Sequence, residues 1–385
     1  MLRPLALCFF ALVAAAAEPA VERLFVLGDW GWADPDMERQ YSLVRQNADL
    51  QRAVAKAMAT QASKEPVSAI LTTGDNFYPN GVKSADDPRW ATSFEKVYDA
   101  PSLQVPWVAS LGNHDHDHEN SAQAQVDYAA KSKGRWIMPA LYYAHHLPVQ
   151  DIRVIVLDAC SLSPRWNSRY FSAAAERATA AQWAWVETEL AKPARWKVVV
   201  GHLPIRSQGI HSNEPEYIRR LTPLLEKHRV QLYLNGHNHH AELVKEKGVA
   251  YVTCGNGSDL YPIGSGQGSE FIGAYAGFTA LDFGREELVI RFFDAEGKVR
   301  HRAIQPNQAN RIAARRGTTQ MQRADINARF GERRAKAPDK AGLILIGHIK
   351  HMRREIGFHR NPLDGDQTRL VFRKQGAGDG TLPLI

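Results

Sequence analysis

Five short polar motifs, each placed directly after a predicted strand, constrain the fold of this 385-residue chain more than any other feature. The clearest is Gly-Asp-Asn-Phe-Tyr at residues 74–78, which follows a short apolar run at 67–71 that is typical of a buried strand. In an open α/β sheet, ligands bind beyond the carboxyl ends of the strands, where Asp75 and Tyr78 would lie. Taken alone, Gly-Asp-Asn is also good turn chemistry, so a plain β-turn explains this single motif equally well.

Strands and helices alternate in the first third of the chain. Predicted strands at 21–27, 67–71 and 105–111 are separated by predicted helices at 38–64 and 89–98. This alternation, with a polar motif after each strand, is typical of parallel βαβ units. Further strands are expected at 142–146, 152–157, 196–200 and 230–234, and further helices at 181–190 and 217–228. Residues 250–253, 277–283, 288–293 and 299–304 are expected to form consecutive antiparallel strands.

The polar residues at these strand ends form a candidate site for two metal ions. Each has a simple structural explanation, because a lone buried histidine is usually a core residue and Asn113 suits a turn. Five strand ends that each close on Gly plus Asp, Asn or His are difficult to explain as turns only. Carboxylate, phenolate, amide and imidazole donors are then too many for one catalytic ion and enough for two. The set consists of Asp29, Asp75, Tyr78, Asn113, His202, His237 and His239.

Ligand chemistry suggests how such a set would divide between two ions. A hard trivalent ion prefers anionic oxygen, so Asp29, Tyr78 and a bridging Asp75 would hold it together with one imidazole. A divalent ion would take Asn113, two imidazoles and the other oxygen of Asp75. Neither set fills six positions, which favours a catalytic site over a structural one.

The five motifs together resemble the five blocks of the metallophosphoesterases. Tyr78, three residues after the proposed bridging Asp75, is similar to the purple acid phosphatases, and residues 80–82 and 121–123 are similar to their small, tartrate-resistant type. The resemblance covers roughly residues 21–304. It implies an α/β fold of four layers, in which two mixed β-sheets pack face to face with flanking helices. The blocks are residues 28–31, 74–78, 112–115, 201–202 and 236–239.

The resemblance also implies roles for individual residues. Asp29, Tyr78 and His239 would bind Fe(III), Asp75 would bridge the ions, and the remaining ligands Asn113, His202 and His237 would bind a second, divalent metal (Fe, Zn or Mn). Two further histidines, His114 and His211, would lie near the phosphate as catalytic and substrate-binding residues, with Asn113 also contacting the substrate.

This chain departs from the family pattern at two points. Small members often carry a cysteine shortly after the position of His211, and this chain has none between Cys160 and Cys254. The stretch beyond about Gln305 has no counterpart in the family.

The expected function is hydrolysis of phosphate monoesters at acidic pH by an acid phosphatase. A metal-bound hydroxide would be the nucleophile, and His114 or His211 would donate a proton to the leaving oxygen. The alternative is a dimetal phosphodiesterase or nucleotidase of the same fold, against which Tyr78 argues because a phenolate ligand suits Fe(III). A metal- or polyanion-binding protein without turnover is the alternative from another class.

The chain is expected to have three parts. Residues 1–17 are predicted to be a signal peptide, since Arg3, an apolar run at 5–13 and three alanines at 15–17 fit its usual organisation. A short anchoring or buried helix is the alternative. Residues 18–305 would be the catalytic domain and 306–385 a basic, poorly ordered tail. We therefore expect a secreted or periplasmic protein without a membrane span in the mature chain.

The distribution of charge argues against a nucleic-acid partner. The net charge is +7, but residues 306–385 hold 16 of the 48 Lys and Arg residues and only 7 of the 41 Asp and Glu residues. The rest of the chain, with 32 basic and 34 acidic residues, is slightly acidic. We expect phosphate monoesters as the partners of a monomeric enzyme. Cys160 and Cys254 allow at most one internal disulfide after removal of the signal peptide.

Overall fold

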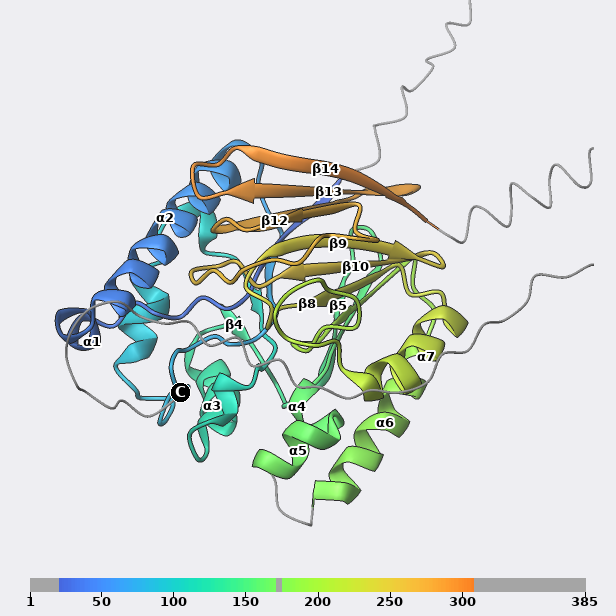
Figure 1. Cartoon of the computed structure of the whole chain (residues 1–385), viewed down its shortest axis with the longest axis horizontal. Coiled ribbons are helices and arrows are strands. Elements are labelled where there is room, and N and C mark those ends of the chain that lie inside the picture. Colours follow the sequence, from blue (N-terminus) through green and yellow to red (C-terminus); the bar gives the residue numbers. More distant parts are fainter. Residues whose placement is uncertain (1–20, 171–174, 308–385) are drawn as a thin grey trace, which may run out of the picture. The chain divides into compact units, whose positions relative to one another are not determined.

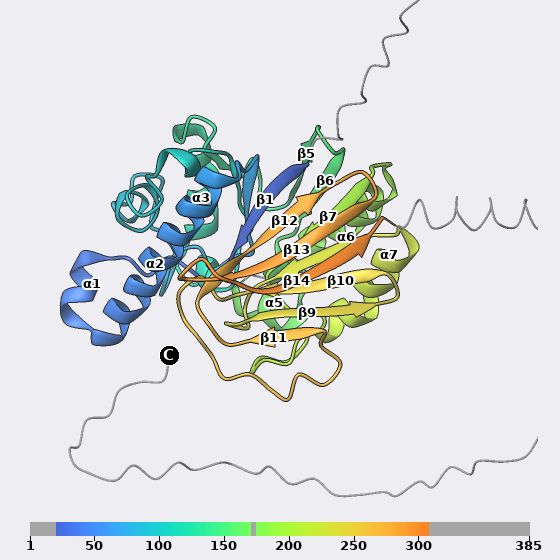
Figure 2. The same ribbon diagram turned by 90° about the horizontal axis from the view of Figure 1, so that it is seen from above.

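Two mixed β-sheets of seven strands each form the centre of the computed structural model, which describes residues 21–170 and 175–307 (Figures 1 and 2). The first sheet has the order β14-β13-β12-β1-β2-β3-β4 and the second β11-β9-β10-β8-β7-β6-β5. The predicted signal peptide and nearly all of the predicted tail lie outside the described residues. The strands of the first sheet are β1 Glu22–Leu27, β2 Ala69–Thr72, β3 Trp107–Val108, β4 Trp136–Ile137, β12 Gly277–Phe283, β13 Glu287–Asp294 and β14 Val299–Pro306. Those of the second are β5 Tyr143–Leu147, β6 Ile152–Val156, β7 Trp196–Val200, β8 Leu232–Asn235, β9 Ala241–Glu246, β10 Val249–Cys254 and β11 Phe271–Gly273.

Helices flank the two sheets on both sides. Figure 2 shows α1, α2 and α3 on one side and α6 and α7 on the other. The α-helices are α1 Pro35–Gln40, α2 Ser42–Lys64, α3 Ser121–Lys131, α4 Ala159–Leu162, α5 Pro164–Tyr170, α6 Ala175–Ala191 and α7 Thr222–Lys227. Shorter 3-10 and π-helical turns are η1 Trp90–Glu95, η2 Pro101–Leu103, η3 His114–His116 and η4 Tyr217–Leu221.

The alternation of side chains along the second sheet explains why it is covered on both faces. Val198 and Val200 of β7 belong to the core between the sheets, whereas Val199 belongs to the core beneath α6 and α7. Successive strand residues point to opposite faces, so a run of apolar residues is needed where both faces are buried. The predicted four-layer α/β fold is therefore confirmed.

The predicted helix at 38–64 is two helices. Asp34 caps α1 by accepting hydrogen bonds from the backbone N–H groups of Asp36 and Met37, at 3.0 and 3.2 Å. Tyr41 then takes an extended backbone (φ −127°, ψ 117°), ends α1 and precedes α2. Helix propensity alone could not reveal this break, because it lies within a run without Gly or Pro.

The parallel strands carry the polar motifs to one region. β1 pairs in parallel with β2, and β2 with β3, in the first sheet, while β7 pairs in parallel with β8 in the second. Each of these strands is followed by a predicted motif. The antiparallel order of β12, β13 and β14 is also as expected, but residues 250–253 form part of β10 in the other sheet, so their placement in that series was wrong.

Candidate metal centre

The loops after β1 and β2 are locked together by their backbones. The N–H of Asp29 donates to the carbonyl of Gly74 (3.0 Å), and the N–H of Trp30 donates to the carbonyl of Asp75 (3.2 Å). Asp29 and Asp75 have φ values of 56° and 51°, a left-handed backbone that costs free energy in residues other than glycine and is concentrated at functional sites. Gly74 (φ 93°) is required as well, because a Cβ there would lie 2.6 Å from the backbone nitrogen of Gly112.

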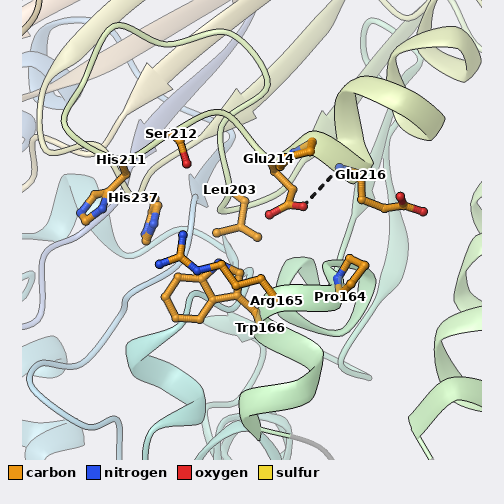
Figure 3. Close-up of a pocket in the computed structure, with 10 residues that line it drawn as sticks. Pro164, Arg165, Trp166, Leu203, His211, Ser212, Glu214, Glu216 and His237 are labelled. Carbon is orange, nitrogen blue, oxygen red and sulfur yellow. Dashed lines mark hydrogen bonds between the residues drawn. The ribbon is translucent and has the colours of Figure 1, made fainter. Parts of the chain in front are cut away.

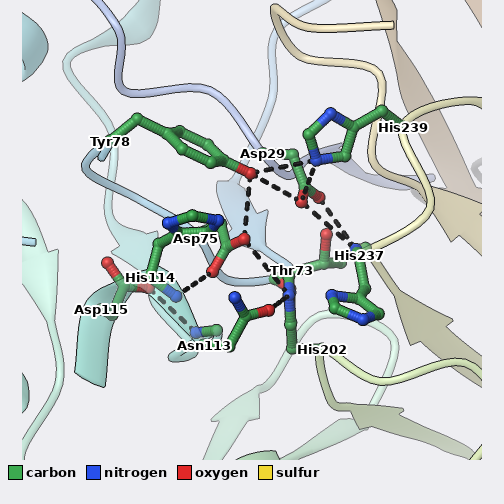
Figure 4. Close-up of polar contacts among 12 residues, drawn as sticks. Asp29, Thr73, Asp75, Tyr78, Asn113, His114, Asp115, His202, His237 and His239 are labelled. Atoms are coloured by element: carbon green, nitrogen blue, oxygen red, sulfur yellow. Dashed lines mark hydrogen bonds and ion pairs between the residues drawn. The ribbon is translucent and has the colours of Figure 1, made fainter. Parts of the chain in front are cut away.

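Tyr78 lies at the meeting point of one half of the site (Figure 4). Its hydroxyl oxygen is 3.1 Å from Asp29 Oδ1, 2.9 Å from Asp75 Oδ2 and 3.1 Å from His239 Nε2. The ring is held in place by a parallel stack on Trp32, with 4.6 Å between centroids. All four polar side chains are buried, so their atoms are screened little by water.

His202 joins the other half of the site to Asp75. Its Nε2 lies 3.0 Å from Asn113 Oδ1 and 3.4 Å from Asp75 Oδ2. Its Nδ1 pairs with the backbone carbonyl of Thr73 at 2.9 Å, which makes Nδ1 the protonated nitrogen and directs Nε2 into the site. Ligand atoms of Asp29, Asp75 and His202 all lie within 4.8 Å of one another, and the three residues come from both sheets.

The loop after β8 closes the site. The N–H of His237 (φ 66°) donates to both carboxylate oxygens of Asp29 at 3.2 Å, and His239 Nε2 lies 3.2 Å from Asp29 Oδ1. Gly236 permits this approach, because a Cβ there would lie 2.2 Å from Asp29 Oδ2. The His237 ring lies 5.0 Å from that of His202, centroid to centroid.

His114 and His211 contact different members of this cluster. The backbone N–H of His114 donates to Asp75 Oδ1 (2.9 Å), and its ring lies 4.5 Å from that of Tyr78. His211 stacks on His237, with centroids 4.1 Å apart. Both histidines are only partly buried, unlike the predicted ligands. The structure thus brings all nine predicted site residues into one cluster.

Neighbouring charges decide the protonation of the cluster. Burial lowers the pKa of His202, but the Asp75 carboxylate outweighs it and raises that pKa to about 9. Burial and Asp29 oppose each other in the same way at His239, whose pKa also rises to about 9. Despite its own burial, Asp75 has a pKa far below its usual range because the imidazoles of His202, His114 and His237 lie near its carboxylate. Protonated imidazoles therefore balance the charge of two buried carboxylates. Bound metal cations would supply that positive charge in place of the protons.

The contacts of the Tyr78 hydroxyl also indicate a binding site for a cation. A phenol has one proton to donate, yet its oxygen faces two carboxylate oxygens and an imidazole nitrogen within 3.1 Å. Burial, followed by Asp29 and Asp75, raises the pKa of this phenol well above 10. A cation among these atoms would allow every one of them to act as a ligand. The residues present therefore fit a dinuclear metal centre.

A buried carboxylate supports the loop that carries Asp75. Asp115 accepts hydrogen bonds from the backbone N–H of Asn76 (3.1 Å to each oxygen), the N–H of Gly112 (2.9 Å) and Gln125 Nε2 (2.8 Å). Burial and the Asp75 charge raise its pKa to about 6. Asp115 lies inside a predicted motif, but sequence reasoning assigned it no role.

Sequence reasoning also missed residues of the loop after β10. The Tyr261 ring stacks on His239, with centroids 3.8 Å apart, and lies 5.6 Å from His211. Asp259 Oδ2 lies 3.5 Å from His239 Nδ1, the nitrogen that faces away from the cluster. A carboxylate behind a metal-ligating histidine orients the ring and increases its basicity. Gly255 and Asn256 follow β10 in the same pattern as the five motifs, but Asp259 and Tyr261 lie farther along the loop, and sequence reasoning assigned them no role.

Three comparisons with known proteins agree with this geometry. The family model described as calcineurin-like phosphoesterase matches residues 22–241. The chain is 31% identical to purple acid phosphatase 4 of Arabidopsis thaliana over 296 residues, which cover 72% of this chain and 81% of that one. It is 30% identical to tartrate-resistant acid phosphatase type 5 of Sus scrofa over 315 residues, which cover 76% and 89%.

A solved structure is similar over the same region. It is described as GAP50, the anchor in the inner membrane complex of Plasmodium, and has a TM-score of 0.64 and 26% identity. The alignment covers 75% of this chain and 89% of that one. Because one fold can host different functions, the activity of this chain has to be argued from its donor set and its relatives.

Proposed function

The chain belongs to the calcineurin-like phosphoesterase family, and within it to the purple acid phosphatases; on this premise we propose that its cluster of buried donors is a dinuclear Fe(III)–M(II) centre. The protein is an acid phosphatase, which hydrolyses phosphate monoesters at a dimetal centre. The finer assignment rests on one observation, the Tyr78 hydroxyl within 3.1 Å of both carboxylates and His239.

These contacts support the ligand sets that the family resemblance implies. Asp29, Tyr78 and His239 would hold Fe(III), and Asp75 would bridge the two ions. Asn113, His202 and His237 would hold the divalent metal, for which Fe, Zn and Mn are the candidates. Burial lowers the pKa of His237, and its histidine neighbours lower it further, which favours the neutral imidazole that a ligand needs. When bound, the ions neutralise charge on the phosphate oxygens and activate water.

The chain's own residues then bind the substrate and move a proton. His114 and His211 contact the cluster and, with Asn113, are proposed to bind the phosphate. The Nδ1 of His114 faces the carbonyl oxygen of Pro79, which can only accept a hydrogen bond, so Nδ1 carries a proton. Nε2 is then the nitrogen available to protonate the leaving oxygen. A general acid of this kind acts in its protonated form, which agrees with the acidic pH optimum expected from the sequence.

Metal analysis combined with two substrates tests this proposal. Purified protein is expected to contain iron and a second metal and to hydrolyse p-nitrophenyl phosphate far faster than bis-p-nitrophenyl phosphate. Faster hydrolysis of the diester would favour a phosphodiesterase. Metal binding without turnover of either ester would favour a binding protein.

The visible spectrum tests the Tyr78 assignment separately. A phenolate bound to Fe(III) gives a charge-transfer band, so the oxidised, iron-loaded protein should be pink to purple and Tyr78→Phe colourless. Activity is expected to survive this change, because three other ligands still hold the ion. Tyr261→Phe is the matched control. The Tyr261 ring stacks on His239, but its hydroxyl is not among the proposed metal ligands, so the band should remain. A band that survives in Tyr78→Phe would refute the assignment.

We also propose that the chain is exported, as the pattern at residues 1–17 suggests. In the described residues, no helix combines the length and apolar character that a bilayer crossing needs. N-terminal sequencing of the native protein should find a start near residue 18. An intact Met1 on the native protein would contradict export with cleavage.

A further inference from the structure

A cavity opens directly beside the candidate metal centre (Figure 3). It encloses about 320 Å³, enough for a small organic group. His211 and His237 form the end nearest the centre, Arg165 and Trp166 of α5 form one wall, and Glu214 lies farther away. A leaving group that extends from a phosphate at the metals past His211, the other proposed proton donor, would enter this cavity.

Arg165 provides the positive charge in this cavity. Its guanidinium lies 5.3 Å from the centre of the Trp166 ring, a cation–π distance. The Trp166 ring is 8% exposed and meets the His237 ring edge to face at 5.5 Å. In Figure 3 the Arg165 side chain follows the indole, and its guanidinium points toward His237. Among the ion pairs of the described residues, none involves Arg165, so its charge is available to a ligand.

A second arginine on the same helix, Arg169, has its charge engaged in an ion pair. The guanidinium of Arg169 lies 5.6 Å from the centre of the same indole, but it forms an ion pair with Asp117 at 3.3 Å and does not line the cavity. The two residues thus share a helix and an aromatic partner and differ in what their charge faces.

The carboxylates at the far end are already engaged. Glu214 accepts a hydrogen bond from the Ser163 hydroxyl (2.8 Å), and Glu216 pairs with Arg219 (2.6 Å) and Arg220 (3.5 Å). In Figure 3 the guanidinium of Arg165 lies nearer to His237 than the Glu214 carboxylate does, so Arg165 is the charged side chain of this wall that a leaving group at the metals would meet first.

We propose that this cavity binds the leaving group of the substrate and that Arg165 selects phosphate monoesters whose leaving group carries an anionic group close to the ester oxygen. The proposal rests on the phosphatase function proposed above. A carboxylate or second phosphate on the leaving group would accept a charge-assisted hydrogen bond from Arg165. A neutral alcohol as the leaving group cannot form such a bond.

Two substrates that differ by one group test this preference. 2-Phosphoglycerate and 2-phosphoglycerol release glycerate and glycerol, so a carboxylate replaces a hydroxymethyl group at the same position. We expect the wild-type protein to have the higher kcat/KM for 2-phosphoglycerate. Arg165→Gln should reduce the ratio of the two kcat/KM values about tenfold, the scale of one hydrogen bond to a charged group. Arg165→Lys, which retains the charge, should restore most of the ratio, and Arg169→Gln should leave it at the wild-type value.

A binding measurement accompanies the kinetics. 3-Phosphonopropionate and propylphosphonate cannot be hydrolysed and differ by one carboxylate. Calorimetric titration of the metal-loaded protein should show tighter binding of 3-phosphonopropionate, and Arg165→Gln should remove most of that difference.

The outcomes separate this inference from the function on which it rests. If the metal-loaded protein hydrolyses neither substrate nor p-nitrophenyl phosphate, the proposed function fails. If it hydrolyses them with a ratio that Arg165→Gln does not change, the function stands and the role of Arg165 is refuted. A ratio that falls equally in Arg169→Gln would also refute it, because a general change in surface charge would then explain the preference.

Discussion

His202 and His114 touch the same carboxylate through different atoms. His202 is fully buried and reaches Asp75 and Asn113 with its ring nitrogen, whereas His114 reaches Asp75 with its backbone N–H. His202→Ala is therefore expected to lose the divalent metal. His114→Ala keeps the backbone contact, so it should retain both metals while kcat falls by about 10²–10⁴, the usual value of general acid–base help. His211→Ala should behave like His114→Ala.

Metal content measured beside kcat decides between these roles. Loss of a metal from His114→Ala would make that residue a ligand. Retention of both metals in His202→Ala would remove it from the proposed ligand set.

Glu22 should make the stability of the fold depend on pH, independently of the metal centre. It is 2% exposed on β1, and its carboxylate accepts the N–H of Gln150 at 2.6 Å. Burial raises its pKa above 4.5, and the hydrogen bond and His146 offset this only in part. A raised folded-state pKa means that the folded chain binds the proton more tightly. The contribution of Glu22 to stability is therefore complete below the unfolded pKa and is lost as pH rises through the folded pKa.

Glu22→Gln should consequently be more stable than wild type near pH 7, because it retains an acceptor oxygen without a buried charge. The difference should narrow as pH falls to about 3, where the wild-type carboxyl is mostly protonated in both states. Urea midpoints at the two pH values check this. A midpoint near pH 7 that is lower than that of the wild type would show that the charged form is the stabilising one.

Single residues of the centre were predictable where a motif stood at a strand end. Asp29, Asp75 and His202 each follow Gly at the end of an apolar run, and local sequence is sufficient to place them. Tyr261 and Asp259 reach His239 from a loop, and only the path of the chain after β10 brings them there. Tertiary contacts of this kind leave no periodic signal.

At the level of elements, four charged side chains join the end of α2 to the first sheet. Arg291 pairs with Glu65 and Asp282 at 2.8 Å each, and Arg23 pairs with the same two carboxylates at 3.4 and 2.5 Å. Asp282 is 12% exposed, so its removal would leave two partly buried arginines to share the more exposed carboxylate of Glu65. Asp282→Asn should lower the free energy of unfolding by about 2–4 kcal/mol, as measured by urea denaturation.

An exposed pair on α1 serves as the control. The side chains of Arg39 and Asp36 are 70% and 80% exposed, and such pairs contribute about 0–1 kcal/mol. Arg39→Gln should therefore change stability by a few tenths of a kcal/mol. Equal effects in the two variants would show that the sheet network is no stronger than a surface pair.

The sequence largely predicted which segments form helices and which form strands. It did not predict to which of the two sheets each strand belongs. Apolar runs located β1, β7 and β12 closely, because each has a buried face. β10 follows β9 by a tight antiparallel return, and the chain then crosses to β12 beside β1 in the other sheet. Both sheets bury apolar faces in the same core, so hydrophobicity does not distinguish them.

At the level of the whole molecule, β14 is the last strand among the described residues, and the predicted domain boundary lies at its end. It pairs with β13 through residue Pro306, and the buried Gln305 donates to the carbonyl of Gly248 at 2.7 Å. All proposed ligands and α5 lie before this strand. Deletion of residues 310–385 should therefore leave phosphatase activity nearly unchanged, whereas deletion of residues 299–385 removes β14 and should prevent folding.

Activity and circular dichroism of the two truncations test the boundary. If the shorter deletion also loses most of its kcat or its folded spectrum, the domain extends beyond residue 305 and the predicted boundary is wrong.

The donors of the centre come from both sheets: Asp29, Asp75 and Asn113 follow strands of the first, and His202 and His237 follow strands of the second. Bound metals would thus cross-link two sheets that also share an apolar core and hydrogen bonds such as that from Gln305 to Gly248. A ligand at one hundred times its dissociation constant stabilises the folded state by about 2.7 kcal/mol. Chelation should lower the melting temperature and increase proteolysis and hydrogen exchange at the loops after β1, β2, β7 and β8. Metal supply would then control how long the protein persists as well as how fast it works.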